Sequence, residues 1–186
     1  MKTLEIIGFQ RANLGKKAAK DLRLEANVPC VLYGGDHQVH FTVPMILFKN
    51  LIYTPEVHRV ELNIEGTLHQ AILQDIQFHP VNEMILHADF LQLFEDREVK
   101  IDVPLQLTGV APGVQKGGKL VQKVTKVRIQ ALPANLPDAI NIDISDMDLG
   151  KSVRVKDIVP ENYKILSSPL VTVATVSVPR ALKSSK

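Results

Sequence analysis

The sequence is dominated by short runs of β-branched and aliphatic residues that alternate with turn formers. Five runs are rich in valine and isoleucine with partial alternation, and they span residues 57–64, 71–78, 85–93, 123–132 and 171–178. Short runs of this composition, bounded by turn residues, are typical of β-strands. The pattern therefore predicts a mainly β protein.

Two segments in the first half favour helices instead. Residues 16–26 place Ala18, Leu22 and Ala26 four residues apart, which makes a narrow apolar stripe along one side. Residues 44–53 begin with a proline, a favoured first helical residue, and continue with several aliphatic residues. We expect both helices to pack on a β core.

A charged run at residues 94–98 separates two apolar-rich parts and predicts a domain boundary. The expected domains are 1–95, which is mixed, and 96–186, which shows strand-like runs between prolines and glycines and no convincing helix. The second domain is therefore expected to be all-β. The tail 180–186 has little that could pack, and we expect it to be frayed.

Composition narrows the class of protein. Hydrophobic residues make up 45% and charged residues 23%, which is typical of a soluble globular chain. No apolar run approaches the roughly 18 residues of a membrane-spanning helix, and no secretory signal is evident. The single cysteine, Cys30, cannot form an internal disulfide, which indicates a reducing compartment. We expect a soluble cytosolic protein.

Motifs for catalysis, cofactors and metals are incomplete. Residues 113–119 nearly spell a phosphate-binding loop, but Leu120 stands where the magnesium-binding serine or threonine belongs, and a strand-like run follows. The aspartates at 143–148 lack the spacing of a calcium loop, and the six histidines are dispersed. We predict no enzymatic activity, no cofactor and no metal.

Positive charge is concentrated rather than general. The chain has a net charge of +2, and residues 1–95 hold eight basic and eleven acidic side chains, so a nucleic-acid surface must be a local patch. Five cations lie within residues 11–23. On a helix, Lys16, Lys20 and Arg23 fall within a narrow arc. This arc suits phosphate binding, but it also suits an ordinary solvated face, and the pattern alone leaves both open.

The run 85–93 carries a second polar feature. Alternation directs Leu86, Ala88 and Phe90 to one side of a strand, and His87 and Asp89 to the other. Such a pair can exchange hydrogen bonds with base edges or ribose hydroxyls, or it can be an ordinary polar face. The cations at 116–128 form a third basic feature, for which a solvated sheet face is the preferred interpretation.

Two pairs of segments together resemble a known family. They are GKKAAKDLR at 15–23 with PCVLYGG at 29–35, and QDIQFHP at 74–80 with HADF at 87–90. Their order and spacing are similar to those of bacterial 5S-rRNA-binding large-subunit ribosomal proteins. NIDISD at 141–146 and LGKS at 149–152 resemble the C-terminal domain of the longer, general stress protein CTC type. The resemblance covers nearly the whole chain.

This resemblance implies an N-terminal β-barrel that binds the loop E region of 5S rRNA, followed by a separate β-rich domain. It implies a structural, ribonucleoprotein role in the cytoplasmic large ribosomal subunit, with 5S rRNA and neighbouring subunit components as partners. It implies no small-molecule substrate and no membrane. The RNA-binding residues carried over by position are Arg11, Lys16, Lys20, Arg23, Tyr33, Gln74, Gln77, His87 and Asp89.

The sequence departs from the family pattern at two points that affect these residues. The family usually has arginine where Lys20 stands, so the planar two-pronged contact of an arginine is absent there. Gln74 and Gln77 lie three residues apart, on opposite faces of a regular strand, so both can contact RNA only if a bulge or strand end intervenes. The alternative from another class is a protein-binding β module, such as a stress factor acting off the ribosome.

Overall fold

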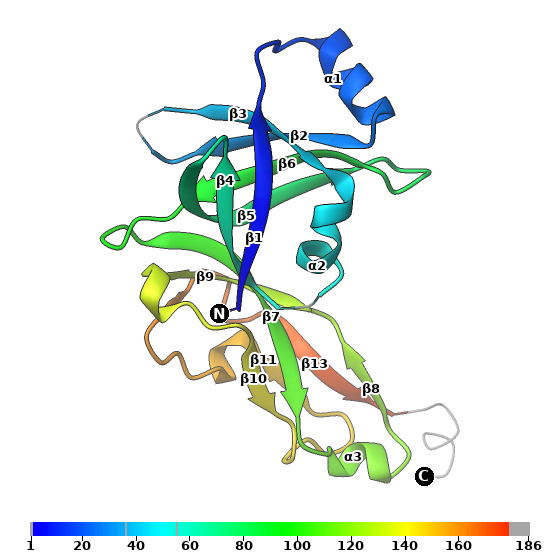
Figure 1. Ribbon diagram of the computed structural model, residues 1–186. Coiled ribbons are helices and arrows are strands. Elements are labelled where there is room, and N and C mark those ends of the chain that lie inside the picture. The colour runs from blue at the N-terminus through cyan, green and yellow to red at the C-terminus, as the bar shows by residue number, and fades with distance from the viewer. Residues whose placement is uncertain (1, 36, 55, 179–186) are drawn as a thin grey trace. The chain divides into compact units, whose positions relative to one another are not determined.

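The computed structural model describes residues 2–35, 37–54 and 56–178. The chain divides into two compact units, Met1–Arg97 and Glu98–Lys186 (Figure 1). The division falls inside the charged run, two residues after the expected boundary. The tail that was expected to be frayed lies outside the described residues.

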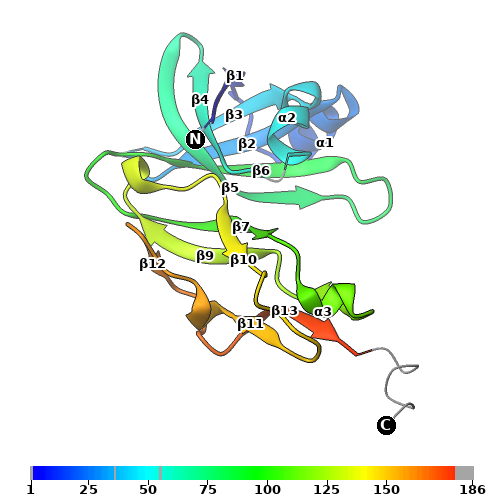
Figure 2. The same ribbon diagram turned by 90° about the horizontal axis from the view of Figure 1, so that it is seen from below.

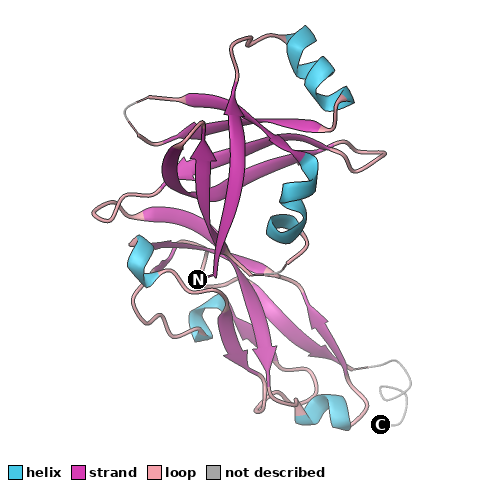
Figure 3. Ribbon diagram, in the orientation of Figure 1, coloured by secondary structure: helices cyan, strands magenta, loops and turns pink. Residues whose placement is uncertain are grey.

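Six strands close into a barrel in the first unit, in the order β1-β3-β2-β6-β5-β4 (Figure 3). The strands are β1 (Lys2–Gln10), β2 (Asn27–Tyr33), β3 (Val39–Pro44), β4 (His58–Ile64), β5 (Thr67–Phe78) and β6 (Ile85–Gln92). The predicted mainly β fold with an N-terminal barrel is confirmed.

Alternation fills this barrel, because every second side chain of a strand points inward. In β4 the buried residues are His58, Val60, Leu62 and Ile64, with half-buried residues between them. The rings of Phe41 and Phe48 pack at 5.8 Å and 6.2 Å from the ring of Phe90. Burial of each such ring contributes roughly 1.5–3 kcal/mol to the free energy of unfolding.

Two helical segments accompany the barrel. The predicted helix at 44–53 begins as the 3-10 turn η1 (Met45–Phe48) and continues as α2 (Lys49–Ile52), and it buries Phe48 and Leu51 in the core.

The other helix, α1 (Lys16–Leu24), has no buried residue, contrary to the expectation that its apolar stripe packs on the core. Ala26 lies outside the helix with a left-handed φ of 58°, so the stripe is shortened to Ala18 and Leu22, which are half-buried.

The pairing of β5 with β6 contains two irregularities. The register shifts between Leu73 and Asp75, which leaves Gln74 as an extra residue in β5. It shifts again where Gln77 pairs with His87 and Phe78 pairs with Ile85, which leaves Leu86 without a cross-strand partner. Leu86 is therefore half-buried rather than part of the core, which corrects the alternation assumed for this strand.

The second unit contains a four-stranded sheet, in the order β10-β7-β9-β12, and a three-stranded sheet, in the order β11-β13-β8 (Figure 2). The strands are β7 (Val99–Thr108), β8 (Lys119–Gln122), β9 (Lys126–Ala131), β10 (Ile140–Asp143), β11 (Ser152–Arg154), β12 (Lys164–Ile165) and β13 (Thr172–Ser177). Three short helical turns interrupt the expected all-β pattern: α3 (Pro112–Gln115), η2 (Pro133–Asn135) and η3 (Val155–Asp157).

Alternation also governs β9, where Val127, Ile129 and Ala131 are buried and Lys126 and Arg128 are exposed. The Arg128 guanidinium donates two hydrogen bonds to the Asp102 carboxylate, at 2.7 Å and 2.9 Å. Lys116 makes a similar contact with Asp148 at 2.9 Å. Two cations of the basic run 116–128 thus already have carboxylate partners.

Candidate nucleic-acid interface

Helix α1 presents unpaired positive charge. Lys16, Lys17 and Lys20 are exposed, and the first turn of the helix contains no acidic residue. Cations near the N-terminus of a helix are unfavourable, because this end already carries partial positive charge. Lys16 and Lys17 in the first turn therefore oppose the stability of the helix, whereas Arg23 in the last turn is favourably placed, and together the cations create a concentrated positive surface.

Arg23 connects this helix to strand β6. Its Nε donates a hydrogen bond to the backbone oxygen of Leu86, at 3.0 Å. Leu86 is the residue before His87, so the contact brings the cationic arc of α1 beside the polar face of β6. The terminal nitrogens of Arg23 have no hydrogen-bond partner in the part of the chain that the structure describes.

The polar face of β6 is organised by a short hydrogen bond between side chains. His87 Nδ1 lies 2.6 Å from Asp89 Oδ1, and the two side chains are 30% and 34% exposed. Across to β5, Gln77 pairs with His87 and Asp75 pairs with Asp89. Directly paired residues share a face of the sheet, so these four side chains form one polar surface.

Gln74 joins this surface through the bulge. Gln74 is the extra residue of β5 and directly precedes Asp75, which pairs with Asp89. The bulge meets the condition under which Gln74 and Gln77 can both reach one ligand. Both glutamines are exposed.

The same face continues onto β2 and β3. Val31 pairs with Asp89 on one side and with His40 on the other, and Tyr33 lies two residues further along β2. Burial raises the pKa of the Tyr33 hydroxyl, and the nearby carboxylates of Asp89 and Asp75 raise it further. Tyr33 therefore keeps its proton at neutral pH and can donate a hydrogen bond.

Arg11 lies at the end of β1, where its backbone N–H donates to the His40 oxygen at 3.0 Å. Its Nη2 donates to the Asn13 oxygen at 3.2 Å, but its buried Nε has no partner among residues 2–35, 37–54 and 56–178. Buried donors are almost always satisfied, so this atom indicates an incomplete site. Arg11 shares a groove with Asp21 and Glu25 of α1 and its C-terminal flank.

We call this region the α1–β6 surface. We define it by the nine residues predicted from the sequence: Arg11, Lys16, Lys20, Arg23, Tyr33, Gln74, Gln77, His87 and Asp89. Hydrogen bonds and strand pairing connect seven of them, whereas Lys16 and Lys20 belong to it only through their place on α1. The strand register adds two residues that sequence reasoning missed as members of the site, His40 and Asp75. The spacing of Asp75 and Gln77 could have suggested a shared face, whereas His40 emerges only from the pairing of β2 with β3.

Other candidate chemistry finds no support in the geometry. Burial raises the pKa of the Cys30 thiol, so it is not activated as a nucleophile. Residues 113–119 run from within α3 through the following turn to the first residue of β8, and the backbone at Asp148 and Leu149 packs against Gly113. In the described ranges, no group of three or more His, Cys, Asp or Glu residues could hold a metal ion.

None of the described helices combines the length and apolar character required to cross a membrane.

Two family models match adjacent parts of the sequence. The model described as the ribosomal L25p family matches residues 6–90, and the model described as ribosomal protein TL5, C-terminal domain, matches residues 98–180. The chain belongs to the ribosomal L25p family. This membership confirms the resemblance seen in the N-terminal signatures and in the C-terminal segment.

Curated relatives match over the full length of the chain. The large ribosomal subunit protein bL25 of Amoebophilus asiaticus is 56% identical over 184 residues, which cover 99% of this chain and 94% of that protein. The protein of the same name from Cytophaga hutchinsonii is 54% identical over 186 residues, covering 100% and 97%. That from Porphyromonas gingivalis is 42% identical over 187 residues, also covering 100% and 97%. This family member is therefore a structural ribosomal protein and not an enzyme. Its predicted location in the ribosome is also confirmed.

Proposed function

We propose that this chain is a structural component of the large ribosomal subunit that binds the loop E region of 5S rRNA through the α1–β6 surface. The observation that supports it most strongly is the hydrogen bond from Arg23 Nε to the Leu86 oxygen. This contact joins a cationic helix, which suits phosphates, to a strand face of hydrogen-bonding side chains, which suits sugars and bases.

The residues divide into two roles. Arg11, Lys16, Lys20 and the terminal nitrogens of Arg23 contact phosphates, and they supply affinity that depends on salt. His87, Asp89, Gln74 and Gln77 contact ribose hydroxyls and base edges in the wide, shallow minor groove of an RNA duplex. Tyr33 donates from its hydroxyl or stacks on a base.

The carboxylates of the α1–β6 surface favour contact with sugars and base edges over contact with phosphates. Asp75 and Asp89 lie opposite each other and repel phosphate, but they accept hydrogen bonds from 2′-hydroxyls and base amino groups. The surface is thus cationic on α1 and anionic on the sheet. A ligand that fits must place phosphates over the helix and groove edges over the strands, which an RNA duplex does.

The exposed lysines of α1 allow a direct test. In the full chain, Lys16→Ala combined with Lys20→Ala should weaken binding to a 5S loop E fragment by about tenfold or more, and lower the salt slope by about 1 for each lysine. Lys151→Ala combined with Lys156→Ala removes two exposed cations from the second unit and serves as the matched control. Binding is measured by fluorescence anisotropy at several salt concentrations.

An unchanged affinity in the Lys16/Lys20 variant would contradict the role given to α1. Equal losses in both variants would show that only total charge matters. A protein-binding module acting off the ribosome predicts neither the salt slope nor the sensitivity to these two lysines.

A further inference from the structure

A second surface of the barrel has the opposite charge. Apart from the cationic segment 11–23, residues 1–95 carry three basic and ten acidic side chains. Asp75 and Asp89 are two of these acids and belong to the α1–β6 surface, so the remaining excess of acidic residues lies on other parts of the first unit. This excess negative charge calls for a cationic neighbour.

The outer face of β1, β4 and β5 combines acidic and apolar side chains with one cation, Arg59, which pairs with Thr3 next to the Glu5–Glu61 pair. Ile7, Phe9 and Leu68 are 51%, 56% and 60% exposed. Asn63 of β4 pairs with Ile7 on one side and Leu68 on the other, so these residues form one row across three strands. Single exposed apolar residues are ordinary, but neighbouring ones rimmed by polar groups are typical of protein-binding sites.

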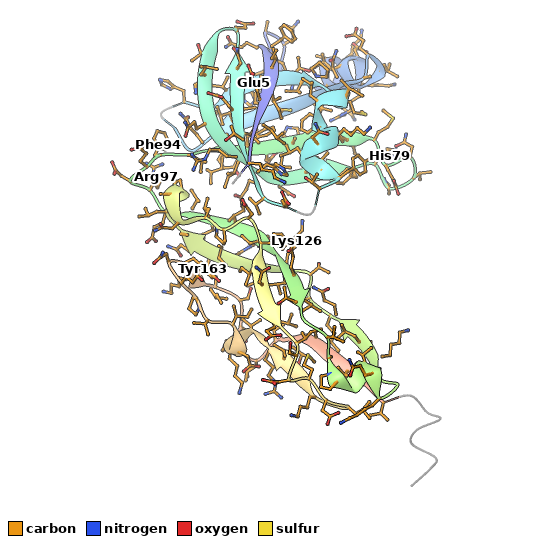
Figure 4. All side chains as sticks on the ribbon, turned by 60° about the horizontal axis from the view of Figure 1, so that its bottom comes forward. Glu5, His79, Phe94, Arg97, Lys126 and Tyr163 are labelled. Carbon is orange, nitrogen blue, oxygen red and sulfur yellow. The ribbon has the colours of Figure 1, made fainter. Side chains whose placement is uncertain are left out.

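Glutamates border this apolar row at both ends. Glu5 of β1 pairs directly with Glu61 of β4, so two like charges lie side by side on neighbouring strands. Neither forms an ion pair with another residue that the structure describes. At the other end, Glu65 accepts a hydrogen bond from the backbone N–H of Gln10 at 3.2 Å. Figure 4 labels Glu5 on β1.

We call Glu5, Ile7, Phe9, Glu61 and Leu68 the β1–β5 face. We propose that this face docks a lysine- and arginine-rich segment of a neighbouring ribosomal protein, whose aliphatic side chains cover Ile7, Phe9 and Leu68. The inference rests on the proposed function, because it requires the chain to sit in the large subunit. The glutamates attract cationic side chains, and the exposed Ile7, Phe9 and Leu68 between them need an apolar cover that a sugar-phosphate backbone does not supply, so the face favours a protein partner over RNA.

Retention of the protein on the ribosome tests whether the β1–β5 face contributes to its binding there. Large subunits that lack this protein are reloaded with the full chain, and its loss is followed during a salt wash. Ile7→Ser combined with Leu68→Ser should speed dissociation about tenfold. Val110→Ser combined with Leu170→Ser removes two residues of similar exposure, 64% and 72%, from the second unit and should leave retention unchanged.

The same variants report on folding and on RNA binding. Because Ile7 and Leu68 are exposed, their replacement should leave the affinity for the isolated loop E fragment within about twofold of the original. Unchanged retention of the Ile7/Leu68 variant would overturn the proposal.

A cross-link identifies what covers the face. Cys30 is fully buried, so Leu68→Cys introduces a single reactive thiol that accepts a benzophenone photo-cross-linker. In reloaded subunits, we expect irradiation to join this position to a lysine- and arginine-rich segment of a ribosomal protein. A cross-link to ribosomal RNA, or to a protein segment without basic residues, would overturn the proposal.

Lys17→Cys on α1 is the control that separates this proposal from the proposed function. Its cross-linker should reach 5S rRNA in the same subunits. If Lys17→Cys reaches 5S rRNA and Leu68→Cys reaches nothing, the docking proposal alone is wrong. If Lys17→Cys fails to reach 5S rRNA, the proposed function is wrong, and the docking proposal that rests on it falls as well.

Discussion

At the scale of single residues, Asp89 determines how His87 presents its ring. The hydrogen bond of 2.6 Å between Asp89 Oδ1 and His87 Nδ1 places the Nδ1 proton toward the carboxylate. The Nε2 atom takes no part in this contact, and under the proposed function it is the ring atom that meets RNA.

His87→Ala should therefore lower selectivity more than general affinity. We expect the preference for loop E over a regular duplex of equal length to fall about tenfold, because a lost base-edge contact costs roughly 1–3 kcal/mol. The salt slope should stay unchanged, since His87 is assigned to base edges or ribose hydroxyls and not to a phosphate. Competition binding measures both quantities. Equal losses on the two RNAs would show that His87 does not discriminate between them.

In the second unit, Asp102 gives a residue-scale prediction about pH. The hydrogen bond from Arg128 holds the pKa of the Asp102 carboxyl below its ordinary value of 3.8. A lowered pKa in the folded state stabilises the fold above the ordinary value, and this contribution is lost as pH falls through the lowered one. In the Asp102→Asn variant, the free energy of unfolding should thus fall less on acidification than it does in the original chain.

The effect of Asp102→Asn should stay below about 1 kcal/mol, because exposed ion pairs are screened by water. Urea unfolding above and below this pH window measures it, with the exposed Asp146→Asn as the control. Identical acid sensitivity in Asp102→Asn and the original chain would contradict the account.

At the scale of elements, α1 lacks the packing that holds most helices. It has nine residues and none is buried, so its stability relies on contacts such as that of Arg23 with Leu86. Isolated helices of this length are marginal in water. We expect the backbone amides of α1 to exchange hydrogen faster than those of the barrel strands in the free chain.

Binding of a loop E fragment should slow the exchange of α1, since RNA would cover the helix and neutralise its charges. Helix α2, which buries Leu51 in the core, should show no such change. Exchange followed by mass spectrometry distinguishes the two helices. Amides of α1 that are already as protected as the barrel, or that RNA leaves unaffected, would contradict this view.

Local sequence patterns predicted the helices and strands better than they predicted strand register, bulges and helix ends. Alternation within one strand is a local property, and it directed His87 and Asp89 outward as the structure shows. The bulge at Gln74 depends on how β5 pairs with β6, and no local pattern encodes this register. For the same reason His40 entered the site only with the structure, through the pairing of β2 with β3. The left-handed turn at Ala26, which shortens α1, also follows from the path of the chain into β2.

At the scale of the whole molecule, charge is separated rather than uniform. Residues 11–23 carry five cations and one acid, whereas the rest of residues 1–95 is strongly acidic. A bulk net charge of +2 conceals this separation. The account assigns the cationic segment to 5S rRNA and the acidic β1–β5 face to a basic protein neighbour, so one barrel would join two kinds of partner.

The central claim, selective binding of 5S loop E, is tested most directly by a salt titration of the full chain with a loop E fragment, against a regular duplex of equal length as competitor. The account predicts tight, selective binding with a slope of log affinity on log salt of about −3, as expected for four phosphate-binding cations. Binding that is no tighter than to the plain duplex would contradict it.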